Sequence, residues 1–135
     1  ESLLNIQMLR DQIKKNPNDV EHWIQLGNLL YEKGDFKSAI EPYGKALELT
    51  SGNNNVRNDY AGCFFNTGDP IRAINELSRI IDSDPRNITA HFNMGVIHSN
   101  IGKRDQAKKY FSKTIELQPG SEFAAKAKSM LDALK

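Results

Sequence analysis

The 135-residue sequence predicts a single all-α domain, built as a right-handed superhelical stack of antiparallel helix pairs. Two observations predict this fold class. Residue types recur with a period of 34 residues, and apolar residues inside each period follow the i, i+3, i+4, i+7 spacing of amphipathic helices. Small residues share one register at Gly27, Ala61 and Gly95, where two helices must approach closely. A period of this length is typical of helical-repeat stacks.

Each period is expected to hold two helices joined by a short turn. In the first complete period, Trp23, Leu26 and Leu30 mark the apolar face of the first helix. Asn18 and Glu21 have the spacing of a capping box, which predicts that this helix starts beside Asn18. The turns carry glycines that suit a left-handed backbone, at Gly34, Gly68 and Gly102.

The period also predicts the boundaries within the domain, which is expected to cover residues 1–135. Three complete units are expected over 20–53, 54–87 and 88–121. A half repeat precedes them as one helix over 1–17, in which Ile6, Leu9 and Ile13 align with second-helix positions, so that its own first helix is missing. After Pro119 the side-chain match to the repeat ends, and an apolar stripe backed by polar residues predicts a capping helix over 122–135.

Composition excludes several function classes. Eighteen Lys and Arg against seventeen Asp and Glu give a net charge of +1, which disfavours nucleic acid and anionic membranes as partners. His91 and His98 are about 10.5 Å apart along a helix, too far to share a metal ion, and are expected to pack as structural histidines. The single cysteine, Cys63, has no base spaced to activate it. No enzyme, metal or cofactor is therefore predicted.

The compartment is left open by the sequence. No segment has the roughly 18 apolar residues of a membrane span, so no membrane insertion by this segment is expected. The chain starts at Glu1 rather than Met, which indicates a piece of a longer protein. The segment is expected to be soluble, and cytoplasmic, or periplasmic or membrane-tethered if a signal or anchor lies upstream.

The motifs of these units resemble the tetratricopeptide repeat (TPR) family. The resemblance rests on Trp23-x-x-Leu26-Gly27-x-x-Leu30, on Ala39-x-x-x-Tyr43-x-x-Ala46, and on the closing prolines Pro17, Pro85 and Pro119. Arg57 and His91 depart from the pattern, since they replace the large aromatic residue of the first unit. The resemblance implies a TPR α-solenoid and a non-catalytic scaffold that binds a peptide or helical segment of a partner protein in its concave groove.

The face of each first helix opposite its apolar stripe is expected to line that groove. It is rich in asparagines, whose amides pair with a peptide backbone, and in aromatic and aliphatic side chains that form pockets. The alternative is that the asparagines are only solvated and the aromatic rings fill gaps between helices. The predicted groove residues are Ile24, Asn28, Tyr31, Asn58, Asp59, Phe65, Asn66, Phe92, Asn93, Val96 and Asn100.

Three further interpretations concern the partner. Domains of the family that clamp the C-terminal carboxylate of chaperones use Lys, Asn and Arg at positions that correspond to Ile24, Asn28, Asp59, Thr89 and Asn93. Only Asn28 matches well, two cationic residues are missing and Asp59 would repel a carboxylate, so binding of a chaperone tail is not expected. Leu4 and Met8, on an uncovered side of the half repeat, are candidates for self-association into a homo-oligomer. The segment could also be the non-catalytic arm of a larger or membrane-anchored protein.

Overall fold

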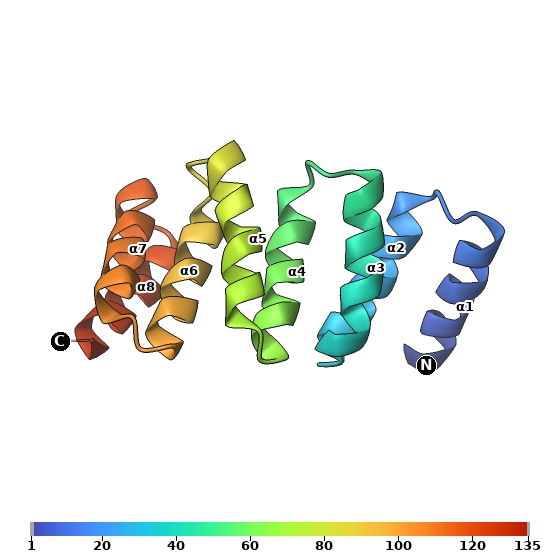
Figure 1. Ribbon diagram of the computed structural model, residues 1–135, viewed down its shortest axis with the longest axis horizontal. Coiled ribbons are helices and arrows are strands. Elements are labelled where there is room, and N and C mark those ends of the chain that lie inside the picture. Colours follow the sequence, from blue (N-terminus) through green and yellow to red (C-terminus); the bar gives the residue numbers. More distant parts are fainter. Residues whose placement is uncertain (1, 135) are drawn as a thin grey trace. The chain divides into compact units, whose positions relative to one another are not determined.

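The computed structural model describes residues 2–134, which form α-helices and turns without any strand, so the predicted all-α fold class is confirmed (Figure 1). Glu1 and Lys135, which the predicted end helices include, lie outside the described residues. The helices are α1 (Ser2–Lys15), α2 (Val20–Glu32), α3 (Phe36–Leu49), α4 (Asn54–Asn66), α5 (Pro70–Ser83), α6 (Ile88–Asn100), α7 (Arg104–Leu117) and α8 (Glu122–Ala133).

The helix boundaries repeat with the same period as the sequence. The even-numbered helices begin at 20, 54, 88 and 122, and the odd-numbered helices begin at 2, 36, 70 and 104. Each even-numbered helix starts with a side-chain cap, in which an oxygen of Asp19, Asn53, Asn87 or Ser121 accepts a backbone N–H of the first turn. The capping box at Asn18 is therefore wrong by one residue. The period also extends through α8, farther than the side-chain match predicted.

Glycine ends the first helix of each pair as predicted. Gly34, Gly68 and Gly102 have φ values of 79°, 89° and 81°, the left-handed conformation that costs other residues most. Asp35 then caps α3 by accepting the N–H of Ser38. Among residues 2–134, no helix is long and apolar enough to cross a membrane.

The contacts divide the chain into two compact units, one ending at Asp69 and the other beginning at Pro70. The single domain over 1–135 stays a prediction. In the first unit, α2 packs against α1 and α3, and α3 packs against α4. Its core gathers around Leu26, Tyr43 and Cys63, which are fully buried.

In the second unit, α6 packs against α5, α7 and α8. Its core includes the fully buried ring of Phe111. The two histidines of α6 are held by carbonyl groups. His91 Nε2 lies 2.8 Å from the Pro85 oxygen, and His98 Nδ1 lies 2.8 Å from the Met94 oxygen. Both rings pack against Tyr110, as expected of structural histidines.

Candidate functional site

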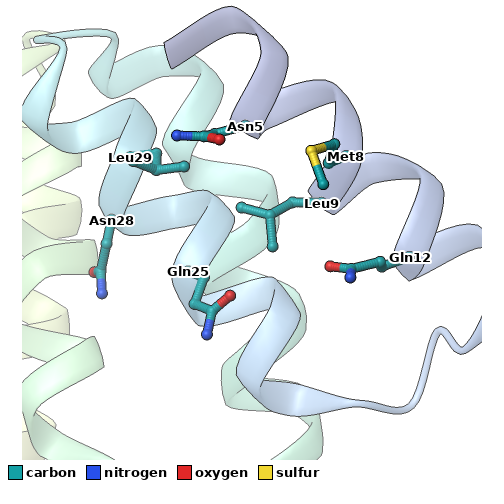
Figure 2. Close-up of a pocket in the computed structure, with 7 residues that line it drawn as sticks. All are labelled: Asn5, Met8, Leu9, Gln12, Gln25, Asn28 and Leu29. Atoms are coloured by element: carbon teal, nitrogen blue, oxygen red, sulfur yellow. The ribbon is translucent and has the colours of Figure 1, made fainter. Parts of the chain in front are cut away.

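A pocket of about 420 Å³ lies between α1 and α2 in the first unit. Figure 2 shows side chains of the two helices facing each other across it. Four of the lining residues are amides and three are apolar. The lining residues are Asn5, Met8, Leu9 and Gln12 of α1, and Gln25, Asn28 and Leu29 of α2.

The helices give the pocket an apolar floor and an open rim. Leu9 is part of the buried core, because it lies on the face of α1 that packs against α2. Met8, the preceding residue, is 53% exposed, and Leu4, one turn earlier, is 63% exposed. Met8 can therefore contact a bound molecule without leaving the core incomplete.

Asn28 is oriented by a tyrosine of the neighbouring helix. Its Oδ1 accepts a hydrogen bond from the Tyr43 hydroxyl at 2.7 Å. Burial, followed by the nearby Asp59 carboxylate, raises the pKa of Tyr43, so the phenol stays protonated and remains the donor. With its oxygen engaged, the exposed Asn28 side chain has its Nδ2 protons for a partner that accepts hydrogen bonds.

The chemistry of this pocket suits binding rather than catalysis. Its seven lining side chains include no acid, base or thiol. Amides donate and accept hydrogen bonds without changing charge, and the apolar side chains between them bury hydrocarbon. No group of three or more His, Cys, Asp or Glu residues that could hold a metal ion occurs in the described part of the chain.

Cys63 is the single cysteine of the sequence, and its environment makes the thiol unreactive. It is fully buried. Burial, with a smaller contribution from Asp59, raises its pKa to about 12, so little thiolate is present at neutral pH. An unreactive thiol agrees with the sequence, in which no base is spaced to activate Cys63.

In the first unit, the predicted groove residues lie in different environments. Asn28 and Asn66 are exposed, although the Asn66 amide donates to the Gly62 oxygen at 2.8 Å. Asn58 is only 5% exposed, so the expectation that it lies on an open surface is wrong. The predicted groove residues of this unit that are half-buried are Ile24, Tyr31, Asp59 and Phe65.

The aromatic rings of the predicted groove mostly pack between helices. Tyr31 meets Phe36 edge to face, with ring centroids 5.0 Å apart. In the second unit, Phe92 lies between Phe111 and Phe123, at 5.8 and 5.3 Å. Such packing favours the alternative in which these rings fill gaps between helices. Of the other groove residues in this unit, Asn100 is exposed and Asn93 and Val96 are half-buried.

The pocket contains residues from two sites that the sequence predicted separately. Met8 was a candidate for self-association and Asn28 a candidate for a peptide groove, and both line it. Asn5, Gln12 and Leu29 were not predicted as site residues. A signal for two of them existed, since Asn5 and Gln12 stand where the next unit has Ala39 and Ala46.

Comparison with known families identifies the repeat. Residues 6–123 match the family described as the cytochrome c-type biogenesis protein H TPR domain. The chain belongs to this family. The resemblance of its motifs to the tetratricopeptide repeat is therefore confirmed, and the TPR domain covers both compact units apart from the ends of the chain.

Similar proteins share this TPR domain within longer chains. The cytochrome c-type biogenesis protein CcmH of Escherichia coli K12 is 34% identical over 83 residues, which are 59% of this chain and 24% of that protein. The chain spans less than a third of the length of the curated relatives it matches first.

Solved structures show the same fold. MamA (residues 41 to end) from Desulfovibrio magneticus RS-1 superposes with a TM-score of 0.86 at 17% identity, covering 98% of this chain and 73% of that one. The first TPR of Spaghetti (RPAP3), bound to the HSP90 peptide SRMEEVD, has a TM-score of 0.77 at 19% identity, covering 85% of this chain and 89% of that one.

Proposed function

We propose that the chain is a non-catalytic protein-binding domain, which holds a peptide or helical segment of a partner protein at the α1–α2 pocket. The observation that carries this proposal is the pocket lining, four amides around three apolar side chains with no charged group. Such a lining matches a polypeptide, which offers backbone hydrogen-bonding groups and apolar side chains together. Membership of a TPR family supports the proposal, since a similar TPR is bound to a peptide.

The peptide proposed for this chain is neutral at the pocket. The SRMEEVD peptide of the similar domain is acidic and ends in a carboxylate. At the clamp positions named above, this chain lacks two of the cationic residues and carries the carboxylate of Asp59. A buried anion without a cationic partner is strongly disfavoured, so a partner of another chemistry is proposed.

The exposed asparagines outside the pocket are proposed as secondary contacts. Asn66 in the first unit offers its amide to a partner longer than the pocket, and Asn100 in the second unit is proposed separately as a contact of that unit. The same proposal extends to the half-buried Asn93 and Val96. These contacts are expected to contribute less than the pocket, because exposed polar groups exchange water for the partner at little net gain.

A peptide-display library panned on the immobilised chain tests the proposal. Selected peptides are resynthesised, and their dissociation constants are measured by fluorescence anisotropy. Peptides that bind the chain are expected to lose at least tenfold in affinity with Met8→Glu, which introduces a charge at the rim of the pocket. The matched control Ile71→Glu changes an apolar residue of α5 that is also mostly exposed but lies outside the pocket, and should leave binding unchanged. Peptides insensitive to Met8→Glu would place binding elsewhere.

A further inference from the structure

Asp59 of α4 is a half-buried carboxylate that has no partner in the described part of the chain. Four acidic residues among residues 2–134 are not exposed to solvent, and they are Asp19, Asp59, Glu76 and Asp84. Glu76 pairs with an arginine at 3.4 Å, and Asp19 and Asp84 accept hydrogen bonds from N–H groups. Asp59 alone of the four forms no hydrogen bond or ion pair with a described residue.

The position of Asp59 within α4 gives its charge no favourable interaction in that helix. It lies past the first turn, where the helix dipole favours an acid. The residues three and four positions away are uncharged, so no ion pair forms along the helix; they are Asn55, Val56, Gly62 and Cys63. Burial raises the pKa of Asp59, so the charged form lowers the stability of the chain. An accessible charge that is held without a partner inside the chain indicates a partner outside it.

The Tyr31 hydroxyl of α2 adds a second oxygen near this carboxylate. It lies 3.0 Å from where a Gly62 side chain would begin, and Gly62 follows Asp59 by about one helical turn. Burial, followed by the Asp59 charge, raises the pKa of Tyr31, so the phenol stays neutral and its oxygen can accept a hydrogen bond. In the described chain, the unpaired side-chain atoms that are fully buried are ring nitrogens of histidines. The oxygens of Asp59 and Tyr31 are therefore reachable from solvent.

The charge of the surrounding unit has the same sign as Asp59. The unit of residues 1–69 carries ten Asp and Glu against seven Lys and Arg. A negative excess of this kind attracts a basic segment before contact and disfavours an acidic one.

Asp59 is also within reach of a segment that occupies the neutral α1–α2 pocket. Asn28 lines that pocket and accepts the hydrogen bond of Tyr43, whose pKa responds to the Asp59 charge. Tyr31 follows Asn28 by three residues, which is about 4.5 Å along α2. A long side chain of a polypeptide bound in the pocket spans such a distance.

We propose that Asp59 binds a lysine or arginine side chain of the partner segment, whose neutral part occupies the α1–α2 pocket. This inference rests on the proposed function and names the charge that the partner carries. The cation forms an ion pair with the Asp59 carboxylate and donates a further N–H to the Tyr31 oxygen. Because the carboxylate is already partly removed from water, this pair is stronger than one on an open surface. The charge that would repel the carboxylate of a chaperone tail thus selects a basic segment.

Peptide selection on two forms of the chain tests the inference. A library of random display peptides is panned in parallel on the 135-residue chain and on its Asp59→Asn variant. Peptides selected on the unchanged chain are expected to share a lysine or arginine at one position, and peptides selected on the variant to lack this preference. Asparagine keeps the shape of the side chain and removes a charge that lowers stability, so the variant is expected to fold, which circular dichroism checks.

The affinity of one selected peptide then assigns the cation to Asp59. The peptide is synthesised with its shared cation and with an uncharged norleucine in that place. Fluorescence anisotropy is expected to show that norleucine weakens binding to the unchanged chain by at least about tenfold, and binding to Asp59→Asn by less than about threefold. Glu41→Gln is the matched control, since it neutralises an exposed acid of α3 in the same unit, and it should leave the full effect of the cation in place.

The alternatives give distinct results. Selected peptides without a shared cation, or equal losses with norleucine in the unchanged chain and in Asp59→Asn, would overturn the inference. If such peptides still lose affinity with Met8→Glu, the proposed function stands and only the charge of the partner is wrong. If no peptide binds saturably, both fail. A cation effect that Glu41→Gln reduces as much as Asp59→Asn would indicate attraction by the net charge of the unit and would equally overturn the assignment to Asp59.

Discussion

The close approach of α6 to α7 makes Gly95 the most informative position for a stability test. A Cβ added at Gly95 would lie 2.5, 2.6 and 2.9 Å from three carbons of the Phe111 ring. Carbon atoms pack best about 3.5–4.0 Å apart, so the ring would have to retreat by about 1 Å. Phe111 is fully buried and has Phe92 beside it, which leaves no open space for that movement.

Two effects of Gly95→Ala oppose each other. Alanine in a helix interior is favoured over glycine by about 1 kcal/mol, whereas forcing a methyl group into a packed core costs about 1–3 kcal/mol. Because the shortened contacts involve a buried ring rather than a flexible chain end, we place the cost at about 3 kcal/mol, the upper end of this range. A net loss of about 2 kcal/mol in unfolding free energy is expected, which lowers Tm by several degrees.

Gly44→Ala is the matched control, since Gly44 also lies inside a helix. The nearest atom to its added Cβ is the Tyr60 hydroxyl oxygen, at 3.4 Å. This contact is close to normal, so helix propensity should dominate and stability should rise by up to about 1 kcal/mol. Urea unfolding followed by far-UV circular dichroism, with unchanged m-values, measures both. Equal stabilisation by the two alanines would refute the packing argument.

Three further predictions concern the side chains of Cys63, Asp59 and Trp23. Cys63, with a pKa of about 12, should react with a thiol reagent at pH 8 only in urea, so rapid modification of the native chain would contradict its burial. Burial raises the pKa of Asp59 above its ordinary value, so its ionisation lowers the unfolding free energy as pH rises through the acid range. Asp59→Asn should flatten that part of the pH–stability curve and raise stability at pH 7 by less than about 1 kcal/mol, because solvent still screens the carboxylate. An unchanged curve in the variant would exclude Asp59 as the source of this pH dependence. Trp23→Phe keeps an aromatic side chain but removes the N–H that donates to the Pro17 oxygen at 2.7 Å, together with part of the packed indole. It should cost at least about 1 kcal/mol in urea unfolding, and a neutral effect would contradict a role for this hydrogen bond.

The sequence predicted the helices well because their signals are local. The glycine turns, the helical spacing of apolar residues and the period all act within one repeat, and each is present in the structure. The start of α2 was misplaced by one residue because Asn18 and Asp19 are both capable caps. The choice of Asp19 is visible in the period, since Asn53 and Asn87 cap the next two first helices.

The candidate site was predicted only in part because it depends on contacts between helices. Asn28 and Met8 were each found from the face of their own helix, but their common pocket required the packing of α1 on α2. Asn58 failed for the same reason. Helical spacing places Asn58 opposite the apolar stripe of its helix, yet Asn58 is buried in the folded chain. The spacing within one helix cannot predict burial by other parts of the chain.

The residues that replace Trp23 in the later units show what its position in the repeat requires. Arg57 and His91 stand where the first unit has the aromatic Trp23, and the sequence alone suggests that they alter the local packing. In the structure, each of the three side chains places a nitrogen within hydrogen-bonding distance of the backbone carbonyl oxygen six residues earlier. The nitrogen–oxygen distances are 2.7 Å from Trp23 to Pro17, 3.0 Å from Arg57 to Ser51, and 2.8 Å from His91 to Pro85. Because a carbonyl can only accept, His91 must carry its proton on Nε2 to make this bond. The shared property is therefore an N–H that ties the first helix to the preceding loop, and three chemically different side chains provide it.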